Sequence, residues 1–161
     1  MSLTYPLKIY QDTVRPEWID RNGHMNMGYY LVVFDFATTE WLDYCGLTTP
    51  YREAHNITTF AVEGHINYLR EVAEGAPLVF TTHLIDFDRK RIHYIHEMWH
   101  ATEGFRASCN ELMSLHIDRE TRRASEMDDE IYERLALIKA EHDTHPMPAE
   151  VGRQLNVPKK K

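Results

Sequence analysis

The chain is poor in cysteine and has no long hydrophobic run. Its two cysteines, Cys45 and Cys109, lie among apolar neighbours without metal-type spacing, which excludes a disulfide framework and indicates buried free thiols. No apolar stretch reaches the roughly 18 residues that a membrane span requires. The first residues also lack the charged-then-apolar pattern of a signal peptide. These absences predict a cytoplasmic protein that makes no membrane contact.

Clusters of basic residues are also scarce. The chain has 18 Lys and Arg against 25 Asp and Glu, and its formal net charge is −7. This balance argues against a nucleic-acid partner, because phosphate binding requires clustered Lys and Arg. The length of 161 residues suits one domain. We expect that domain over residues 1–145, with residues 146–161 as a C-terminal tail that ends in the basic run 159–161.

Hydrophobic periodicity predicts an α+β protein. The helical segment 27–45 is apolar on almost every side, which predicts a helix surrounded by protein. The strands after it follow one another through short turns, so the sheet should be largely antiparallel and should curl around that helix. The predicted elements are strand 6–14, helix 27–45, strands 58–69, 78–87, 91–101 and 105–118, and an amphipathic helix 128–142 with Ser125 or Asp128 as its cap.

Alternation within two strands assigns their faces. In 105–118, the apolar residues at odd positions predict one apolar face, and Glu111 falls on it. A carboxylate there needs a partner or a raised pKa. In 58–69 the even positions are mainly apolar and the odd positions polar. The even set is Phe60, Val62, Gly64, Ile66 and Tyr68, and the odd set is Glu63, His65 and Asn67.

A polar cluster stands directly before the long helix. Asp20, Asn22 and His24 precede a helix start near Asn26, where free backbone N–H groups and the positive end of the helix dipole can stabilise a developing oxyanion. A carboxylate beside them can act as a base toward water or as a nucleophile. Together these groups suit hydrolysis of an acyl group. The same residue types also form ordinary turns, and Asn22 or Asn26 would serve equally as a helix cap.

The motif Asp20-x-Asn22-Gly23-His24-Met25-Asn26-x-x-x-Tyr30, followed by Phe34 and Ala37, resembles the active-site signature of hot-dog-fold acyl-thioesterases of the 4-hydroxybenzoyl-CoA thioesterase-like superfamily. The predicted element order is similar to that of a hot-dog domain, in which a curved antiparallel sheet wraps one long central helix. The later segments "EGHINYLREV", "DRKRIHYIHEMWH" and "ELMSLHID" resemble the betainyl-CoA thioesterases of bacterial carnitine breakdown.

The resemblance implies hydrolysis of an acyl-CoA thioester to free acid and CoA. It implies that Asp20 is the catalytic carboxylate, that Asn22 and His24 position water or the acyl group, and that backbone N–H groups of Asn26, Met27 and Gly28 bind the oxyanion. It implies no metal and no redox cofactor, since CoA is part of the substrate. Active sites of this family usually form between subunits, so the resemblance also implies a homodimer or homotetramer.

Further polar and aromatic residues are candidates beside this motif. Glu63 is a candidate second acid across a subunit interface, or a solvent-facing side chain. Glu111 is a candidate wall of the active site, or one half of a packed ion pair. The cluster Arg89, Lys90 and Arg91 is a candidate grip for CoA phosphates, or a solvated turn. Aromatic faces attract quaternary ammonium groups, and the candidates for an acyl pocket are Trp18, Tyr29, Tyr30, Tyr68 and Trp99.

Three alternative functions follow from the same residues. One is a thioesterase for another acyl group, aromatic or fatty, on CoA or acyl carrier protein. Another is a hot-dog module that binds acyl-CoA without turnover. The third is a metalloprotease, because His96-Glu97-Met98-Trp99-His100 has the H-E-x-x-H pattern. That pattern needs a helix, whereas turn residues on both sides and many β-forming residues predict a strand here.

Overall fold

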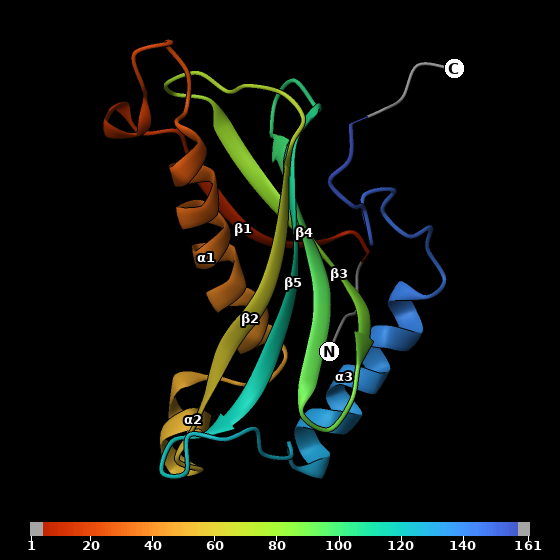
Figure 1. Ribbon diagram of the computed structural model, residues 1–161. Coiled ribbons are helices and arrows are strands. Elements are labelled where there is room, and N and C mark those ends of the chain that lie inside the picture. The colour runs from red at the N-terminus through yellow and green to blue at the C-terminus, as the bar shows by residue number, and fades with distance from the viewer. Residues whose placement is uncertain (1–4, 158–161) are drawn as a thin grey trace.

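The computed structural model describes residues 5–157, so the predicted basic run 159–161 lies outside the described residues. The chain forms the predicted strands and the two predicted helices (Figure 1). It also contains two short helical segments that periodicity did not predict. In chain order the elements are β1 (Leu7–Thr13), η1 (Pro16–Trp18), α1 (Met27–Tyr44), α2 (Thr49–Ala54), β2 (Ile57–Tyr68), β3 (Pro77–Phe87), β4 (Arg91–His100), β5 (Arg106–Asp118) and α3 (Asp129–His142).

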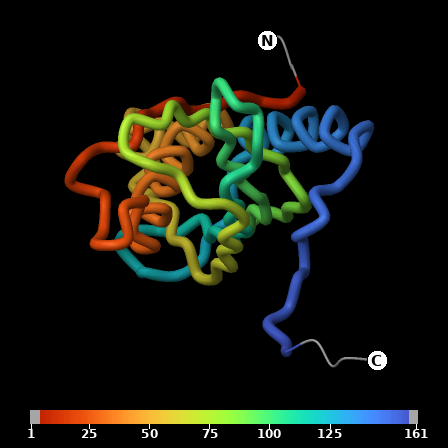
Figure 2. The backbone as a smooth tube through the Cα atoms, turned by 90° about the horizontal axis from the view of Figure 1, so that it is seen from above, coloured from red at the N-terminus to blue at the C-terminus, as the bar shows by residue number. Residues whose placement is uncertain are grey.

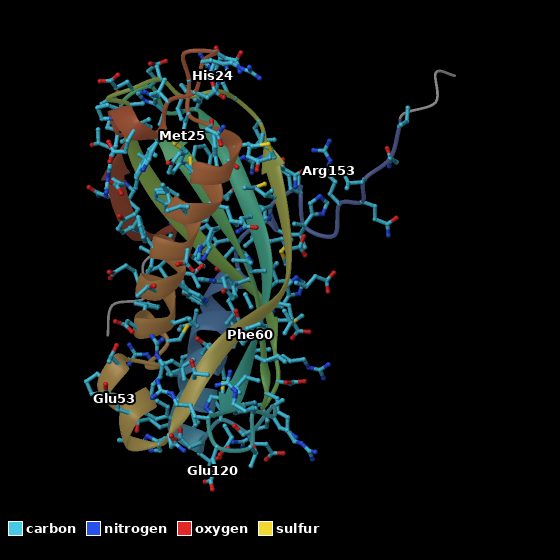
Figure 3. All side chains as sticks on the ribbon, turned by 60° about the vertical axis from the view of Figure 1, so that its left-hand side comes forward. His24, Met25, Glu53, Phe60, Glu120 and Arg153 are labelled. Carbon is cyan, nitrogen blue, oxygen red and sulfur yellow. The ribbon has the colours of Figure 1, made fainter. Side chains whose placement is uncertain are left out.

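The strands form one antiparallel sheet with the order β1-β3-β4-β5-β2. The sheet curves beside α1, which confirms the predicted α+β architecture of a curved antiparallel sheet around one long helix (Figure 1). The start of α1 lies at one end of the molecule, whereas the β3–β4 turn and α2 lie at the other end. In a view of all side chains, His24 and Met25 mark the first end, and Glu53 and Glu120 mark the second (Figure 3).

Helix α1 begins and ends at residues whose chemistry stops a helix. The side chain of Asn26 caps the N-terminus by accepting a hydrogen bond from the Gly28 N–H. Gly46, just past the C-terminus, has φ of +94°, which glycine adopts without strain. The buried side of α1 packs against the sheet through residues that include Val33, Phe34, Ala37 and Trp41.

The prediction that α1 is surrounded by protein is wrong for the single chain. Met27 is 66% exposed and Leu31 is 54% exposed, and Val32 and Phe36 are also accessible. These residues share the side of the helix that the sheet does not cover. Burial of apolar area is the main favourable term in folding and association, so an uncovered apolar stripe of this kind favours contact with another protein surface.

The amphipathic helix α3 completes the core at the other end of α1. Its apolar residues Ile131, Leu135 and Ile138 belong to the same buried cluster as Trp41 and Leu84. Asp128 caps the helix by accepting from the Ile131 N–H, as one of the two predicted caps. A view along the molecule shows the coils of α1 and α3 at separate positions around the strands (Figure 2).

The predicted apolar face of 58–69 is partly wrong, because β2 contains a bulge. We call the sheet face toward α1 the inner face and the opposite one the outer face. Ala61 pairs with Ser114 and Glu63 pairs with the next residue of β5, Met113, so Val62 is an extra residue without a partner on β5. The bulge reverses the alternation: Tyr68 points toward α1, whereas Phe60 lies on the outer face, where it is 61% exposed.

Part of the predicted C-terminal tail contacts the outer face. Arg106 on β5 forms ion pairs with Glu97 on β4 and with Glu150, the latter at 2.6 Å. The Gly152 N–H donates to Glu111 Oε2 at 2.8 Å. Figure 3 shows Arg153 on the side of the sheet away from α1. Among residues 5–157, no helix is long and apolar enough to cross a membrane.

Candidate active site

The loop before α1 is a tight, hydrogen-bonded turn. The Asp20 N–H donates to the His24 carbonyl at 3.1 Å, and the Gly23 N–H donates to the Asp20 carbonyl at 3.0 Å. Gly23 has φ of +85°, which a glycine permits without strain. The Met25 N–H donates to the Val72 carbonyl at 2.9 Å, which ties the loop to the segment between β2 and β3. The backbone of the motif is therefore fixed from both sides.

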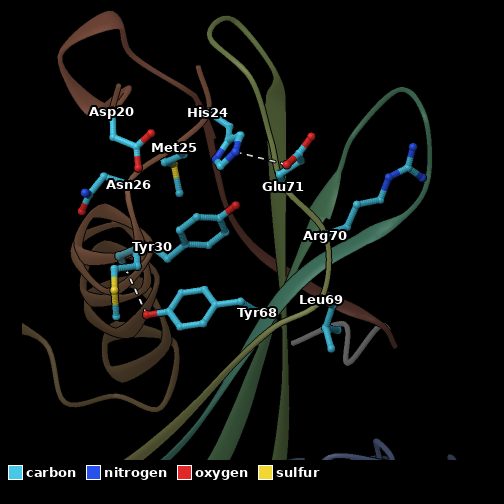
Figure 4. A pocket seen from close by; sticks show the side chains of 10 residues that line it. Asp20, His24, Met25, Asn26, Tyr30, Tyr68, Leu69, Arg70 and Glu71 are labelled. Carbon is cyan, nitrogen blue, oxygen red and sulfur yellow. Dashed lines mark hydrogen bonds and ion pairs between the residues drawn. The ribbon is translucent and has the colours of Figure 1, made fainter. Parts of the chain in front are cut away.

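Asp20 lines a cavity and has one carboxylate oxygen fixed by the loop. Its Oδ1 accepts a hydrogen bond from the Asn22 N–H at 2.7 Å, which sets the orientation of the side chain. Asp20 lines a cavity of about 410 Å³ between the start of α1 and the segment that follows β2 (Figure 4). The hydrogen bonds of the described residues leave Oδ2 without a donor, so this oxygen can accept a proton from a water molecule or attack a carbonyl carbon.

The three predicted oxyanion donors differ in availability. The Asn26 N–H donates to the Trp18 carbonyl at 2.9 Å, and the Gly28 N–H donates to the Asn26 side chain at 2.9 Å. The hydrogen bonds of residues 5–157 give the Met27 N–H no acceptor. Asn26 thus serves as the helix cap that its residue type also allowed. Met27 supplies the donor that remains, at the positive end of the α1 dipole.

Tyrosine rings form one wall of the cavity. Tyr30 and Tyr68 meet edge to face with ring centroids 5.3 Å apart, and the Tyr68 hydroxyl donates to the Met27 carbonyl at 3.1 Å. Burial raises the pKa of Tyr30, so its hydroxyl is neutral near pH 7. The full lining is Asp20, His24, Met25, Asn26, Met27, Tyr30, Tyr68, Leu69, Arg70 and Glu71.

The other two polar residues of the motif have different positions. His24 Nε2 lies 3.2 Å from a carboxylate oxygen of Glu71, and both side chains line the cavity (Figure 4). Asn22 is exposed and lines a neighbouring cavity of about 540 Å³ instead. Its contribution to the Asp20 site is the backbone N–H that holds the carboxylate.

Two of the predicted pocket aromatics pack beside the loop instead of lining the cavity. Trp18 is buried and its ring stacks on that of Tyr29 at 5.9 Å. Arg15 covers the Trp18 ring at 4.6 Å from its centroid. These contacts support the backbone of the loop, which includes the Trp18 carbonyl that accepts from Asn26.

The structure separates three further candidates from Asp20 within one chain. Glu63, Trp99 and Glu111 all lie on the outer face of the sheet, whereas the cavity at Asp20 opens on the inner side. Glu111 has the partner that its burial required, because His93 Nε2 lies 2.7 Å from Oε1. The Trp99 N–H donates to the Thr81 hydroxyl at 3.2 Å. Glu63 is exposed and shares a surface cavity with Glu111.

The basic cluster lies at the opposite end of the molecule from Asp20: Arg89 and Lys90 are in the β3–β4 turn and Arg91 begins β4 (Figure 1). Each cation has an acidic neighbour in the same chain. Arg91 pairs with Asp88 at 2.5 Å, and the other two pair with Asp129 and Glu126. The solvated-turn alternative describes this arrangement, and within one chain the cluster does not reach the cavity.

The H-E-x-x-H segment is part of strand β4, so it lacks the helix that a zinc protease requires. His96 is fully buried between two hydroxyl groups, Thr82 Oγ1 at 2.8 Å and Thr38 Oγ1 at 3.1 Å. Burial lowers its pKa to about 3. This histidine is therefore a neutral part of the core that joins α1 to the sheet.

Sequence reasoning did not single out three residues that line the cavity, Leu69, Arg70 and Glu71. Leu69 is the last residue of the predicted strand 58–69, and Arg70 and Glu71 follow it, where the alternating pattern ends and periodicity gives no assignment. Arg70 places its guanidinium 3.8 Å from the centroid of the Phe105 ring. The adjacent polar pair "RE" after an apolar strand was the available clue, and only the backbone tie between Met25 and Val72 brings it to Asp20.

The fold and this site define a hot-dog protein with a carboxylate at the N-terminus of its central helix. Residues 14–135 match the thioesterase-like superfamily, and the chain belongs to that family. It is 35% identical to the betainyl-CoA thioesterase of Pseudomonas aeruginosa over 94% of this chain and 96% of that protein. It is 34% identical to the L-carnitine dehydrogenase/betainyl-CoA thioesterase of Agrobacterium fabrum, of which it spans 30% of the length.

Among solved structures, a hypothetical protein from Staphylococcus aureus in complex with CoA superposes with a TM-score of 0.87. It is 28% identical to this chain, and the match covers 94% of this chain and 98% of that one. The similarity therefore extends over the whole fold, from β1 to the C-terminal helix.

Proposed function

We propose that the protein is a thioesterase that hydrolyses betainyl-CoA to betaine and CoA. One observation of the structure carries the proposal: Asp20 and Met27 line the same cavity, and among residues 5–157 the N–H of Met27 at the start of α1 has no acceptor. Thioester hydrolysis needs both groups, one to activate the attacking oxygen and one to bind the charge that develops on the carbonyl. The identity to a betainyl-CoA thioesterase along almost the full length of both chains supports the choice of acyl group.

The reaction assigns a role to each of these groups. Asp20 accepts a proton from water, and the resulting hydroxide adds to the thioester carbonyl carbon. The carbonyl oxygen becomes an anion that accepts a hydrogen bond from the Met27 N–H. The intermediate then collapses, the C–S bond breaks, and the proton held by Asp20 passes to the CoA thiolate. In the alternative route, the Asp20 carboxylate attacks directly, and water hydrolyses the mixed anhydride.

The tyrosine wall suits a cationic acyl group. Betaine carries a quaternary ammonium, and such a cation is attracted to the faces of aromatic rings. Tyr30 and Tyr68 present rings to the cavity that Asp20 lines. The interaction contributes about 0.5–2 kcal/mol, depending on how far the cation is desolvated. It favours betainyl-CoA over an uncharged acyl-CoA of the same shape.

We propose that the active form is a homodimer in which a second copy covers the exposed side of α1. That side carries Met27 and Leu31, next to the site. Strand β2 is a 12-residue edge strand of the sheet, with Phe60 and Val62 exposed on it. A long edge strand offers unpaired N–H and C=O groups to another strand. An apolar cavity of about 410 Å³, lined by Leu31, Val32 and Leu112 among others, lies between α1 and β2.

The test is a panel of acyl-CoA esters assayed with a thiol-trapping reagent. It should include betainyl-CoA, acetyl-CoA, 4-hydroxybenzoyl-CoA and palmitoyl-CoA. We expect the highest kcat/KM for betainyl-CoA. A thermal shift with CoA and no thiol release from any ester would instead indicate a binding module without catalysis. A clear preference for an aromatic or fatty acyl-CoA would reject betaine as the acyl group and keep the thioesterase.

A further inference from the structure

The chemistry of betainyl-CoA fixes where its positive charge lies. The ammonium nitrogen is two bonds from the thioester carbonyl carbon, a separation of about 2.5 Å with standard bond lengths and angles. The cation therefore occupies the same cavity as the reacting carbon. Within one chain, the groups that recognise the charge must line the cavity at Asp20, since the rest of the chain is too far from it.

Two carboxylates line that cavity, Asp20 and Glu71. Asp20 is required for the reaction itself. Glu71 lies in the segment after β2, across the cavity from the loop that carries Asp20 (Figure 4). The one guanidinium of the lining, that of Arg70, stacks on the ring of Phe105, and its side chain is turned away from Asp20 in Figure 4. The described lining therefore has a net negative charge where the cation must bind.

His24 holds the Glu71 carboxylate in position. Its Nε2 lies 3.2 Å from Oε2 of Glu71. This contact limits the positions of the Glu71 side chain, which is 72% exposed. The contact gives His24 a task different from the positioning of water that the family resemblance implied.

We propose that Glu71 is a specificity-determining residue that selects acyl groups bearing a positive charge, with His24 as its positioning residue. The inference rests on the proposed thioesterase function at Asp20. The attraction between Glu71 and the ammonium raises the affinity for betainyl-CoA in the ground state and in the transition state alike. It has no effect on an uncharged isostere. A specificity role of Glu71 therefore changes the ratio of kcat/KM for the charged ester to kcat/KM for the uncharged ester. A purely structural role would change both values by the same factor.

The experiment compares betainyl-CoA with its uncharged isostere 3,3-dimethylbutanoyl-CoA in the wild type and in Glu71→Gln. Glutamine keeps the size of the side chain and an oxygen beside His24 Nε2, and it removes the negative charge. The control is Glu74→Gln, which removes an exposed carboxylate three residues further on that lines only the neighbouring cavity. We expect Glu71→Gln to lower kcat/KM for betainyl-CoA about five- to tenfold and to leave the uncharged ester within about twofold. Glu74→Gln should leave the ratio of the two substrates unchanged.

Ionic strength provides a second measurement. The preference of the wild type for betainyl-CoA should decrease as salt rises from about 0.01 to 0.5 M, and the preference of Glu71→Gln should change less. An unchanged ratio in Glu71→Gln, with betainyl-CoA still a good substrate, would overturn the role of Glu71 and leave the proposed function intact. A wild type that hydrolyses neither ester would overturn the proposed function and this inference together.

Discussion

Replacement of Asp20 by Asn tests the proposed chemistry with the smallest structural change. The Asn side chain has the shape of Asp and keeps an oxygen that can accept from the Asn22 N–H, so the turn before α1 should persist. What disappears is the basic carboxylate oxygen that lines the cavity. Asp20→Ala removes the acceptor as well, which makes the Asn variant the cleaner probe of catalysis.

The expected loss follows from the role of Asp20. General base catalysis contributes about 10²- to 10⁴-fold to a rate, so kcat for betainyl-CoA should fall by at least about a hundredfold. This factor corresponds to about 2.7 kcal/mol of transition-state stabilisation. Asp20 is partly exposed and keeps its hydrogen bond in the variant, so the free energy of unfolding should change by less than about 0.5 kcal/mol.

A matched control lies at the other end of the molecule. Asp86 is exposed, and its Oδ1 accepts from the neighbouring Phe87 N–H at 2.9 Å. Asp86→Asn should retain the wild-type kcat in the same thiol-release assay, with the melting temperature of both variants followed by differential scanning fluorimetry. An Asp20→Asn protein that is folded and keeps more than about a tenth of the wild-type kcat would refute the assignment of Asp20 as the base.

Two further predictions concern assembly and acid stability. Leu31→Asp places a charge on the exposed side of α1, where the proposed dimer interface would bury it without a partner. Analytical ultracentrifugation should show a shift from dimer to monomer, and the thioesterase activity should be lost. An unchanged dimer would contradict the proposed interface. Burial lowers the pKa of His96 to about 3, and burial, with the nearby histidines, lowers that of His142 to about 4. The unfolded chain binds protons at these imidazoles near pH 6.5 and the folded chain does not, so the free energy of unfolding should fall between pH 6.5 and 4, by up to about 1.4 kcal/mol per pH unit for each histidine. Urea unfolding at several pH values measures this slope, which should be shallower in His96→Asn; equal slopes would exclude His96 as a source.

Local sequence was sufficient to predict the part of the candidate site that is formed by the loop before α1 and the first residues of that helix. Asp20, Asn26 and Met27 lie within eight residues of one another, and the turn and helix-cap chemistry of this segment determines their arrangement. The strand order along the chain also predicted the antiparallel sheet, because hairpin connections allow few alternatives. Tyr68, one of the candidate pocket aromatics, reaches α1 because it follows the bulge in β2, which sequence alternation did not predict.

The remaining candidates depended on which face of the sheet each residue occupies, and alternation alone does not decide that. Both faces of β5 are covered, one by α1 and the other in part by the C-terminal segment, so an apolar face indicates burial without saying against what. Alternation therefore left Glu111 as either a wall of the active site or half of a packed ion pair, and the structure shows the ion pair, with His93. Sequence analysis missed Glu71 because its position depends on long-range structure. The hydrogen bond from the Met25 N–H to the Val72 carbonyl brings together two segments that are almost fifty residues apart in the sequence.

The ion pairs of Arg106 have a consequence for how this protein can be shortened or joined to another. A chain cut after residue 145 would lose Glu150 and the Gly152 N–H, so Arg106 and Glu111 would keep only their partners within the sheet. The smallest piece with the native outer surface therefore extends to Gly152. A tag or a second enzyme attached at this end should begin beyond that residue, so that the junction does not disturb the last segment that the sheet holds.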